Sequence, residues 1–414
     1  MSFPRYPKYK PSGVEWLGDV PEGWEVKPLK FVATYNDDVI DETTPPETEI
    51  LYVDISAVDA LDGIRMKEPM AFSAAPSRAR RRVKHGDTII STVRTYLRAI
   101  ARVRTPEENL IVSTGFAVIR PRADLSPDYV GNVVSASYFI EQVIARSTGV
   151  GYPAINASDL ARIPVAIPPL PEQTAIAEFL DRETGKIDGL VAEQRRLMEL
   201  LKDKIASLVL SSVDLPSTKR LRFGDAASLI SRPVLQQQEE SYTRIGLFNR
   251  GRGLFHKDAS EMDDMGESDF FWIEEGDLII SGQFAWEGAV AMAGKDDTGC
   301  VVSHRYPVIH GVPGIAMTEY LFGLLCTNHG DFLLNENSRG AAGRNRPLNI
   351  RSLMKELIPV PTMEIQKAVA SAIHSRTALF KEISKAIDHL QERRSALISS
   401  AVTGQIDVRQ HPKN

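Results

Sequence analysis

The sequence has few cysteines and no long apolar run. Only Cys300 and Cys326 occur among 414 residues, so neither a disulfide framework nor a cysteine-rich zinc site is available. No run approaches the roughly 18 apolar residues that a membrane span needs, and the N-terminal segment lacks the apolar core of a signal peptide. We therefore expect a cytoplasmic protein that makes no membrane contact.

An excess of positive charge is also missing. The chain carries 49 Lys and Arg against 54 Asp and Glu, which gives a formal net charge of −5. This balance excludes a protein that coats nucleic acid or an anionic membrane with its whole surface. It leaves room for local basic patches.

The motifs of several enzyme classes are absent as well. The sequence contains no Gly-x-x-x-x-Gly-Lys phosphate loop, no His-Glu-x-x-His zinc motif and no Gly-x-Ser-x-Gly nucleophile elbow. His304 and His310 have no carboxylate near them in sequence, which is typical of ordinary structural histidines. We expect neither a catalytic site nor a metal site, and no cofactor bound by this chain.

What the sequence does contain is an internal repeat. Residues 86–91 (Gly-Asp-Thr-Ile-Ile-Ser) recur as residues 276–281 (Gly-Asp-Leu-Ile-Ile-Ser), 190 residues further on. Residues 160–173 then match residues 353–366 at an offset of 193. An offset that drifts so little over such a length indicates a duplication.

Each copy begins with short apolar runs separated by Gly, Pro, Asn and Asp, which is typical of an α/β or α+β globular domain. Residues 50–53, 88–90 and 116–119 are predicted strands, whereas 127–146 and 317–334 are predicted helices. The predicted division is a first globular domain at 1–165, a central helix at 166–213, a second globular domain at 214–357, a C-terminal helix at 358–407 and a tail at 408–414.

The second part of each copy is a long predicted helix with apolar residues at a and d heptad positions. A single stripe of this kind is also typical of a helix lying on its own domain. Two copies favour pairing, because a narrow seam suits a partner helix of the same kind. We predict an intramolecular antiparallel coiled coil that separates two similar globular domains related by a pseudo-twofold axis. The predicted seam comprises Ile187, Leu190, Leu197, Leu201, Leu208, Phe380, Ile383, Ile387, Leu390 and Leu397.

Basic residues gather in one part of the first copy. Eleven lie between Arg65 and Arg104, opposed by Glu68 and Asp87 alone. The planar arginine side chain binds phosphate and pairs with the O6/N7 edge of guanine, so this cluster is a candidate DNA-binding surface. An ordinary solvated face is the alternative. The candidates in this copy are Arg78, Arg80, Arg81, Arg82, Lys84, Arg94, Tyr96 and Arg98.

The second copy is acidic overall, but its basic residues occur in two Gly-rich stretches, 249–253 and 339–346. The matching stretch of the first copy, 147–152, carries an aromatic residue in place of arginines. Loops with different side chains on the same fold suit two domains that recognise different DNA sequences. Ordinary loop variation is the alternative. These loops add the candidates Tyr152, Arg250, Arg252, Arg339, Arg344, Asn345 and Arg346.

Several motifs of this sequence resemble those of a known family. Residues 6–18 (Tyr-Pro-Lys-Tyr-Lys-Pro-Ser-Gly-Val-Glu-Trp-Leu-Gly) and 21–26 resemble the start of specificity subunits of type I restriction-modification systems. So does Ile-Pro-Pro-Leu-Pro-Glu-Gln at 167–173, followed by a long helix. The second copy is similar at 358–361 and 399–407, but Met363-Glu364-Ile365 stands where Leu-Pro-Glu would be expected. The resemblance covers essentially the whole chain.

This resemblance implies a function. In that family two target-recognition domains each read half of a bipartite site in double-stranded DNA, and the helices set the spacer between the halves. The helices also dock two methylation subunits, which bind S-adenosylmethionine, and added restriction subunits give an ATP-dependent nuclease that requires Mg²⁺. The specificity subunit itself is not catalytic.

Two other interpretations stay open on the residues alone. One is a structural adaptor whose coiled coil organises partners without reading DNA, and the acidic second copy favours it slightly. The other is a DNA-modifying enzyme with an active site that leaves no linear motif. Charge reversal across 78–84 separates the adaptor from a DNA reader, because only the reader would lose salt-sensitive DNA binding.

Overall fold

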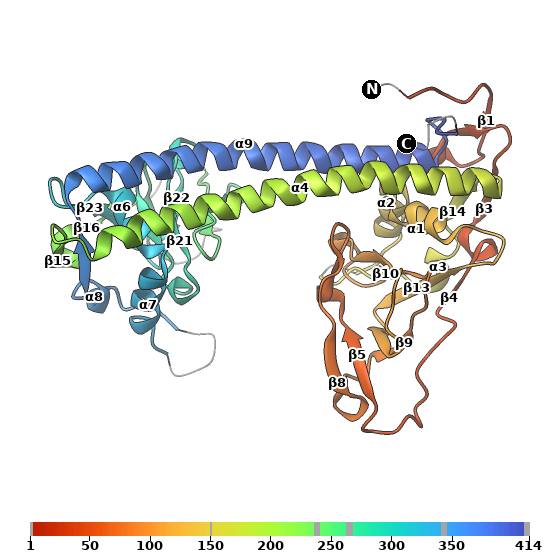
Figure 1. Cartoon of the computed structure of the whole chain (residues 1–414), viewed down its shortest axis with the longest axis horizontal. Helices are drawn as coiled ribbons and strands as arrows, with labels where there is room; N and C mark the ends of the chain where they lie inside the picture. The colour runs from red at the N-terminus through yellow and green to blue at the C-terminus, as the bar shows by residue number, and fades with distance from the viewer. Residues whose placement is uncertain (1–2, 150, 236–240, 262–267, 341–345, 410–414) are drawn as a thin grey trace. The chain divides into compact units, whose positions relative to one another are not determined.

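The chain forms two compact units (Figure 1). The computed structural model describes residues 3–149, 151–235, 241–261, 268–340 and 346–409. Unit 1 comprises Met1–Glu193 and Ala386–Asn414, and unit 2 comprises Gln194–Lys385. The predicted long helices are observed as α4 (Leu170–Val213) and α9 (Met363–Val402), and each contributes a segment to both units.

The globular part of unit 1 is built from two four-stranded sheets and three short helices. The first sheet is antiparallel with the order β11-β10-β13-β4, and the second has the order β8-β5-β12-β9 with β5 and β12 parallel. The elements are β1 (Tyr9–Pro11), β2 (Asp19–Pro21), β3 (Glu25–Pro28), β4 (Ala33–Tyr35), β5 (Glu49–Val53), β6 (Val58–Asp59), β7 (Gly63–Ile64), β8 (Glu68–Ala71), β9 (Ala79–Arg82), β10 (Thr88–Ser91), β11 (Ile100–Arg102), β12 (Leu110–Ser113), β13 (Phe116–Pro121), α1 (Pro127–Ser135), α2 (Ser137–Ala145), α3 (Ala157–Leu160) and β14 (Pro164–Ile167).

The globular part of unit 2 repeats the first of these sheets, and in its described residues the strand pairs β17-β18 and β19-β22 stand in place of the second. Its antiparallel sheet has the order β21-β20-β23-β16, which matches the first sheet of unit 1 strand for strand. The predicted duplication is therefore confirmed. The elements are β15 (Lys219–Arg222), α5 (Phe223–Ala226), β16 (Ala227–Ile230), β17 (Ile245–Leu247), β18 (Leu254–His256), β19 (Phe270–Trp272), β20 (Leu278–Ile280), β21 (Val290–Met292), β22 (Val301–Ser303), β23 (Val308–Gly311), α6 (Thr318–Leu325), α7 (Asn328–Glu336), α8 (Ile350–Leu353) and β24 (Leu357–Val360).

The repeated Gly-Asp pair forms the turn that begins the central strand of each antiparallel sheet. Both glycines have a φ of 88°, a conformation that favours glycine. The following carboxylates, Asp87 and Asp277, are buried, and each accepts a hydrogen bond from the backbone amide three residues earlier. Each is also bound by a side chain of the neighbouring strand, Arg120 in unit 1 and His310 in unit 2. The motif therefore recurs for a structural reason.

The two helices predicted in the globular parts are each divided in the structure. The predicted helix at 127–146 is α1 followed by α2, and the one at 317–334 is α6 followed by α7. Ala136 between α1 and α2 has extended backbone angles, and Thr327 caps α7 by accepting a hydrogen bond from the amide of Gly330. A side-chain cap therefore begins α7, and a residue with extended backbone separates α1 from α2, where apolar periodicity alone predicts one helix.

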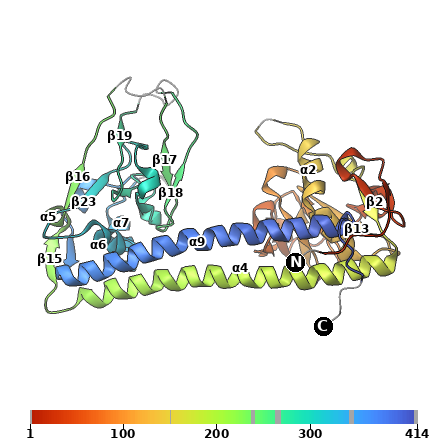
Figure 2. The same ribbon diagram turned by 90° about the horizontal axis from the view of Figure 1, so that it is seen from above.

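In both units the segments of α4 and α9 lie side by side and run antiparallel (Figure 2). In unit 1 the start of α4 shares a core with the end of α9, as Leu180 and Ile398 exemplify. In unit 2 the end of α4 shares a core with the start of α9, as Val209 and Val369 exemplify. No helix of the described residues is long and apolar enough to cross a membrane.

The predicted seam is wrong by one residue along part of α4. Ile187 is buried, but Leu190, Leu197 and Leu208 are exposed at 48%, 42% and 37%. The buried row continues instead through Val191, Ile205 and Val209. The helix packs against its globular part as well as against its partner helix, so its buried stripe is wider than an a/d seam and follows the period of 3.6 residues.

The seam residues of α9 and Leu201 of α4 are closer to the prediction. Ile383 is buried, whereas the remaining residues of this group are partly buried. They are Leu201, Phe380, Ile387, Leu390 and Leu397.

The N-terminal motif of the sequence lies where α4 begins and α9 ends. The hydroxyl of Tyr6 and the indole N–H of Trp24 both donate hydrogen bonds to Oε1 of Glu172, at 2.5 and 3.1 Å. The hydroxyl of Tyr9 donates to the carbonyl oxygen of Gly404 at 2.9 Å. The N-terminal motif and both helix motifs therefore belong to one packed region of unit 1.

This packing explains why the second copy departs from the motif. Ile365 occupies the position that corresponds to Glu172 at the offset of 193. The aromatic partners of Glu172 come from the N-terminal segment, which belongs to unit 1. A carboxylate at this position of unit 2 would lack these aromatic hydrogen-bond donors, so nothing there favours it.

Candidate nucleic-acid interface

Two loops of unit 1 are joined at the edge of the antiparallel sheet. We name residues 92–98 and 147–155 the first loop pair. The amide of Arg94 donates to the carbonyl of Pro153 at 2.7 Å, and the amide of Ile155 donates to the carbonyl of Thr92 at 2.9 Å. The side-chain hydroxyl groups of Thr95 and Ser147 are also hydrogen-bonded, at 2.8 Å. The sequence-predicted residues Arg94 and Tyr152 are thereby brought together.

The first loop pair presents its polar and aromatic side chains to solvent. A 3₁₀ turn at Thr95–Leu97 buries Thr95 and leaves Tyr96 exposed at 53%. Arg94 and Arg98 flank this turn with φ values of 49° and 52°. Left-handed backbone at residues other than glycine costs of order 1 kcal/mol each and concentrates at functional sites. The fold thus holds these side chains outward in a strained conformation.

Arg94 and Tyr152 form a stacked pair across the two loops. The guanidinium carbon of Arg94 lies 4.7 Å from the centroid of the Tyr152 ring, within the range of a cation–π interaction. Tyr152 is itself exposed at 69%. An exposed aromatic ring of this kind adds little to stability, so its placement indicates a surface that contacts another molecule.

Unit 2 has a loop pair at the corresponding place, formed by the described residues 282–288, 338–340 and 346–348. The amide of Leu348 donates to the carbonyl of Gly282 at 2.8 Å, as Ile155 does to Thr92 in unit 1. The turn is again a 3₁₀ turn, Ala285–Glu287, and Gly288 has a left-handed φ of 68° at the position of Arg98. We name these residues the second loop pair.

The second loop pair also carries a stacked arginine. The guanidinium carbon of Arg346 lies 5.0 Å from the ring centroid of Trp286. Trp286 was not predicted from the sequence, although the offset of 190 places it opposite Tyr96 and would have identified it. Arg344 and Asn345, predicted in the same loop, lie outside the described residues.

A wide cavity of about 1320 Å³ lies beside the second loop pair. Arg250, Arg252, Trp286 and Arg346 line it, together with asparagines and residues of α4. The amide of Arg250 donates to the carbonyl of Glu287 at 3.1 Å, which ties this arginine loop to the 3₁₀ turn. The predicted Gly-rich stretch at 249–253 and the second loop pair therefore form one surface.

Comparison with known proteins shows which family this chain resembles. The family model of the type I restriction modification DNA specificity domain matches residues 21–194. The specificity subunit of the type I restriction enzyme StySPI of Salmonella potsdam is 20% identical over 323 residues, which cover 72% of this chain and 69% of that protein. The chain is thus similar to the specificity subunits of type I restriction-modification systems.

A solved structure from a type I restriction-modification system shares the fold of this chain. A chain from a study of complex assembly and conformational transition of the type I R-M system is 21% identical, with a TM-score of 0.55, over 92% of this chain and 98% of that chain. The HsdS subunit of Thermoanaerobacter tengcongensis is also 21% identical, with a TM-score of 0.45, over 94% of this chain and 98% of that chain. The former likeness shows that the two chains have the same fold.

The predicted basic run at 78–84 lies on and around β9, and intramolecular contacts hold most of it. Arg78 forms an ion pair with Asp54 at 3.1 Å, and Lys84 forms one with Asp38 at 2.8 Å. Arg81 is partly buried, which lowers its pKa, and its Nη2 donates to the carbonyl of Thr114 at 3.3 Å.

The other two residues of the run are held less tightly. The guanidinium of Arg80 lies over the ring of Phe72, and Arg82 is exposed. The amide of Thr114 donates to the carbonyl of Arg78, and the amide of Thr92 donates to the carbonyl of Gly115, so this strand adjoins the first loop pair. Its role in DNA binding stays a prediction.

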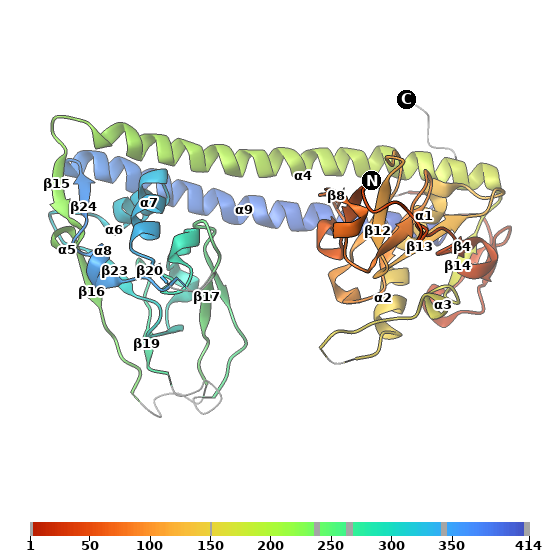
Figure 3. The ribbon, with the colours of Figure 1, turned by 90° about the horizontal axis from the view of Figure 1, so that it is seen from below.

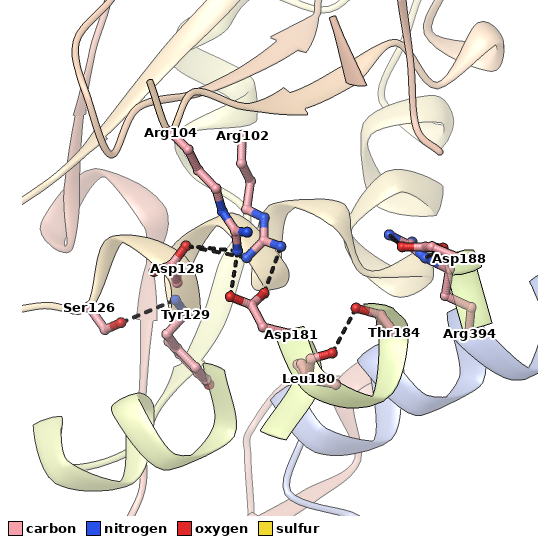
Figure 4. A network of polar contacts seen from close by, with 10 residues as sticks. All are labelled: Arg102, Arg104, Ser126, Asp128, Tyr129, Leu180, Asp181, Thr184, Asp188 and Arg394. Atoms are coloured by element: carbon pink, nitrogen blue, oxygen red, sulfur yellow. Dashed lines mark hydrogen bonds and ion pairs between the residues drawn. The ribbon is translucent and has the colours of Figure 1, made fainter. Parts of the chain in front are cut away.

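Two further arginines of the basic cluster attach the globular part to helix α4 (Figure 4). Arg102 and Arg104 donate to Asp181 of α4 at 2.9 and 2.5 Å, and both also contact Asp128 at 3.4 Å. These guanidinium groups point toward the helix, so their role is to hold the globular part against α4. The cluster thus divides into arginines that face outward and arginines that hold the helix.

The remaining predicted residue of unit 2 has a local partner. Arg339 donates to the carboxylate of Glu336, three residues earlier, at 2.9 Å. Both side chains are largely exposed, so this ion pair is weak and solvent-screened. Arg339 therefore remains accessible to a ligand.

Proposed function

We propose that each unit of this chain reads one half of a bipartite site in double-stranded DNA through its loop pair. The observation that supports this most strongly is the recurrence of a contact between an exposed arginine and an aromatic ring in the loop pairs of a duplicated fold, with different residues in each copy. A common scaffold with different surface chemistry suits recognition of two different half-sites in the major groove.

The two long helices set the distance between the half-sites in this proposal. Helices α4 and α9 each supply segments to both units, so their length links the two reading surfaces. Half-sites about one helical turn apart, roughly 34 Å, require a stiff connection. Paired helices supply stiffness without the entropic cost of ordering a flexible linker.

The catalytic work belongs to partner subunits in this proposal. Two methylation subunits would bind S-adenosylmethionine and dock on the helices, and restriction subunits would supply the ATP- and Mg²⁺-dependent cleavage. Exposed leucines of α4 in unit 2, Leu197, Leu200 and Leu208, give an apolar helix face on which another protein can pack. The chain itself would hold no cofactor.

A substitution confined to one loop pair tests the assignment of half-sites. The complex of this chain with its methylation subunits is given plasmid DNA, and methylated positions are located by methylation-sensitive sequencing. We expect the double variant Arg94→Ala/Tyr152→Ala to alter one half of the methylated motif, with the other half and the spacer retained. Alteration of both halves, or of neither, contradicts the proposal.

A change in helix length tests the role of the helices. Seven residues are inserted after Glu193 and seven before Ala386, which lengthens both helices by about 10 Å. We expect the preferred spacer to grow by about three base pairs. The control replaces one existing heptad by the same inserted sequence without a change in length. An unchanged spacer in the lengthened variant would rule out this role.

A further inference from the structure

The stacked arginine–aromatic pair is retained in the two units although its residues are exchanged between the loops. In unit 1 the guanidinium comes from the turn, as Arg94, and the ring comes from the opposite loop, as Tyr152. In unit 2 the ring comes from the turn, as Trp286, and the guanidinium comes from the opposite loop, as Arg346. The two pairs do not occupy matching positions, since Trp286 corresponds to Tyr96 and not to Arg94, so the shared feature is an arginine–aromatic pair that joins the same two loops.

Stability does not account for this pair. Both arginines and Tyr152 are exposed, and an exposed cation–π contact contributes only about 0.5–1 kcal/mol. Among the described residues, neither Arg94 nor Arg346 has a carboxylate partner at ion-pair distance. Arg102 and Arg104, by contrast, are held by Asp128 and Asp181. The stacked guanidinium groups are therefore uncompensated cations on the surface.

The contact with the ring leaves the guanidinium donors available. A cation–π contact uses none of the N–H donors in a hydrogen bond, and two of these donors match O6 and N7 of guanine with two parallel hydrogen bonds. The ring also restricts the rotamers of the long arginine side chain, which lowers the entropy lost on binding. These are the properties of an arginine that reads a base.

We propose that Arg94 and Arg346 each read a guanine, one in either half-site, and that Tyr152 and Trp286 are the residues that position them. This inference rests on the proposed function, and it adds the identity of one base in each half. Both loop pairs then recognise guanine with an arginine, which comes from the turn in the first pair and from the opposite loop in the second.

The test removes the N7 acceptor from single guanines. The methylated motif is first obtained from the complex with methylation subunits. Each guanine of a duplex that carries this motif is then replaced in turn by 7-deazaguanine, and dissociation constants are measured. We expect a loss of about tenfold at one guanine in each half-site. In Arg94→Ala the loss at the first half-site disappears, and in Arg346→Ala the loss at the second disappears.

Two controls separate positioning from bulk charge. Arg162→Ala removes an exposed arginine outside both loop pairs and should leave both 7-deazaguanine effects unchanged. Tyr152→Phe keeps the ring and should keep the effect in the first half-site, whereas Tyr152→Ala should reduce it severalfold. Loss of the effect in Tyr152→Phe would contradict stacking as the positioning contact.

The outcomes also distinguish this inference from the proposed function. If Arg94→Ala changes recognition in one half-site only at a base other than guanine, the bipartite reading stands and the guanine assignment falls. The same holds if a half-site contains no guanine. If neither substitution changes recognition in any half-site, both the inference and the assignment of reading to the loop pairs are wrong.

Discussion

Gln173 and Gln366, which are 193 residues apart, make the same hydrogen bonds in the two units. Gln173 accepts from the amide of Ser126 at 3.0 Å and donates to the carbonyl of Pro168 at 2.9 Å. Gln366 accepts from the amide of Met317 at 2.7 Å and donates to the carbonyl of Pro361 at 2.9 Å. Each glutamine thus ties the start of a long helix to the residue before a short helix, α1 in unit 1 and α6 in unit 2. Figure 3 shows these short helices near the long ones.

Removal of the glutamine side-chain amide should destabilise each unit. Gln173→Ala leaves the partly buried backbone amide of Ser126 and the buried carbonyl of Pro168 without these partners, so we expect the free energy of unfolding to fall by about 2 kcal/mol. Gln366→Ala should act likewise in unit 2. Chemical denaturation followed by circular dichroism measures both. Gln283→Ala, at an exposed position, is the control and should change stability by less than about 0.5 kcal/mol. Equal effects of all three would refute the role.

The duplication and the two long helices were predictable because they leave periodic signals in the sequence. The Gly-Asp turn recurs since a left-handed glycine and a buried carboxylate are both needed before the central strand. The glutamine of the Pro-Pro-Leu-Pro-Glu-Gln motif recurs for the same kind of reason. Backbone requirements of this type select specific residues, so they remain visible in one sequence.

The helix seam was less predictable because several neighbours share each helix. Leu190 and Leu197 match a heptad pattern, yet Val191 is the residue that is buried. A heptad pattern describes contact with one partner helix. It does not describe a helix that also covers a globular part, whose position relative to the helix arises from long-range packing.

The candidate site was predicted in part. Arg94 and Tyr152 carry a compositional signal, as arginine and an aromatic residue in polar loops. That they stack could not be inferred, since the two loops are brought together by hydrogen bonds between distant residues such as Thr92 and Ile155. Trp286 was missed because it lies outside both Gly-rich stretches that carry the basic residues of the second copy.

The ion pairs of Asp181 with Arg102 and Arg104, which we name the α4 clamp, should affect how strictly the complex selects the spacer length. Asp181→Asn weakens the contacts to Arg102 and Arg104 (Figure 4). These side chains are partly exposed, so we expect a loss of stability of no more than about 1 kcal/mol. The globular part would be held less firmly, and the complex should tolerate spacers one base pair longer or shorter. Methylation assays on a series of spacer lengths measure this.

A matched control for the clamp is Asp214→Asn. Asp214 lies just after α4 with a side chain that is 93% exposed, and its contact with Arg220 is long at 3.7 Å. This variant should keep the spacer preference of the parent. If Asp181→Asn prefers one spacer length as strictly as the parent does, the clamp does not position the globular part.

The C-terminal end of unit 1 should respond to acid. Hydrogen bonds from Arg409 hold the pKa of Asp407 below its usual range. A carboxyl with a lowered folded-state pKa contributes stability above its unfolded pKa of about 3.9, and this contribution is lost as the pH falls below that value. Asp407→Asn should therefore lower the thermal midpoint at pH 7. The difference from the parent should shrink as the pH falls from about 4 to 3.

Measurement of thermal midpoints between pH 7 and pH 3 decides this prediction. The exposed Asp214→Asn variant serves again as the control and should follow the parent throughout. A difference between Asp407→Asn and the parent that persists unchanged at pH 3 would mean that the ionised carboxylate is not the source of the stability.

Arg376 of helix α9 is a buried cation without an acidic partner among the described residues. Its side chain is held between Phe322 and Phe380, with the guanidinium carbon 5.4 Å from each ring centroid, and burial lowers its pKa. Its Nε atom is buried and makes no hydrogen bond. An unpaired buried charge costs more free energy than these ring contacts return. A residue of similar length without charge should therefore be more stable here.

We expect Arg376→Met to raise the free energy of unfolding by about 1 kcal/mol. Arg376→Ala, which also removes the stem that packs between the two rings, should lower it because it leaves a cavity. Denaturant titrations of the parent and both variants give the comparison. If Arg376→Met is less stable than the parent, the stacking of the guanidinium outweighs its desolvation. The charge would then be part of what holds α9 to unit 2, in the same way that Asp181 holds α4 to unit 1.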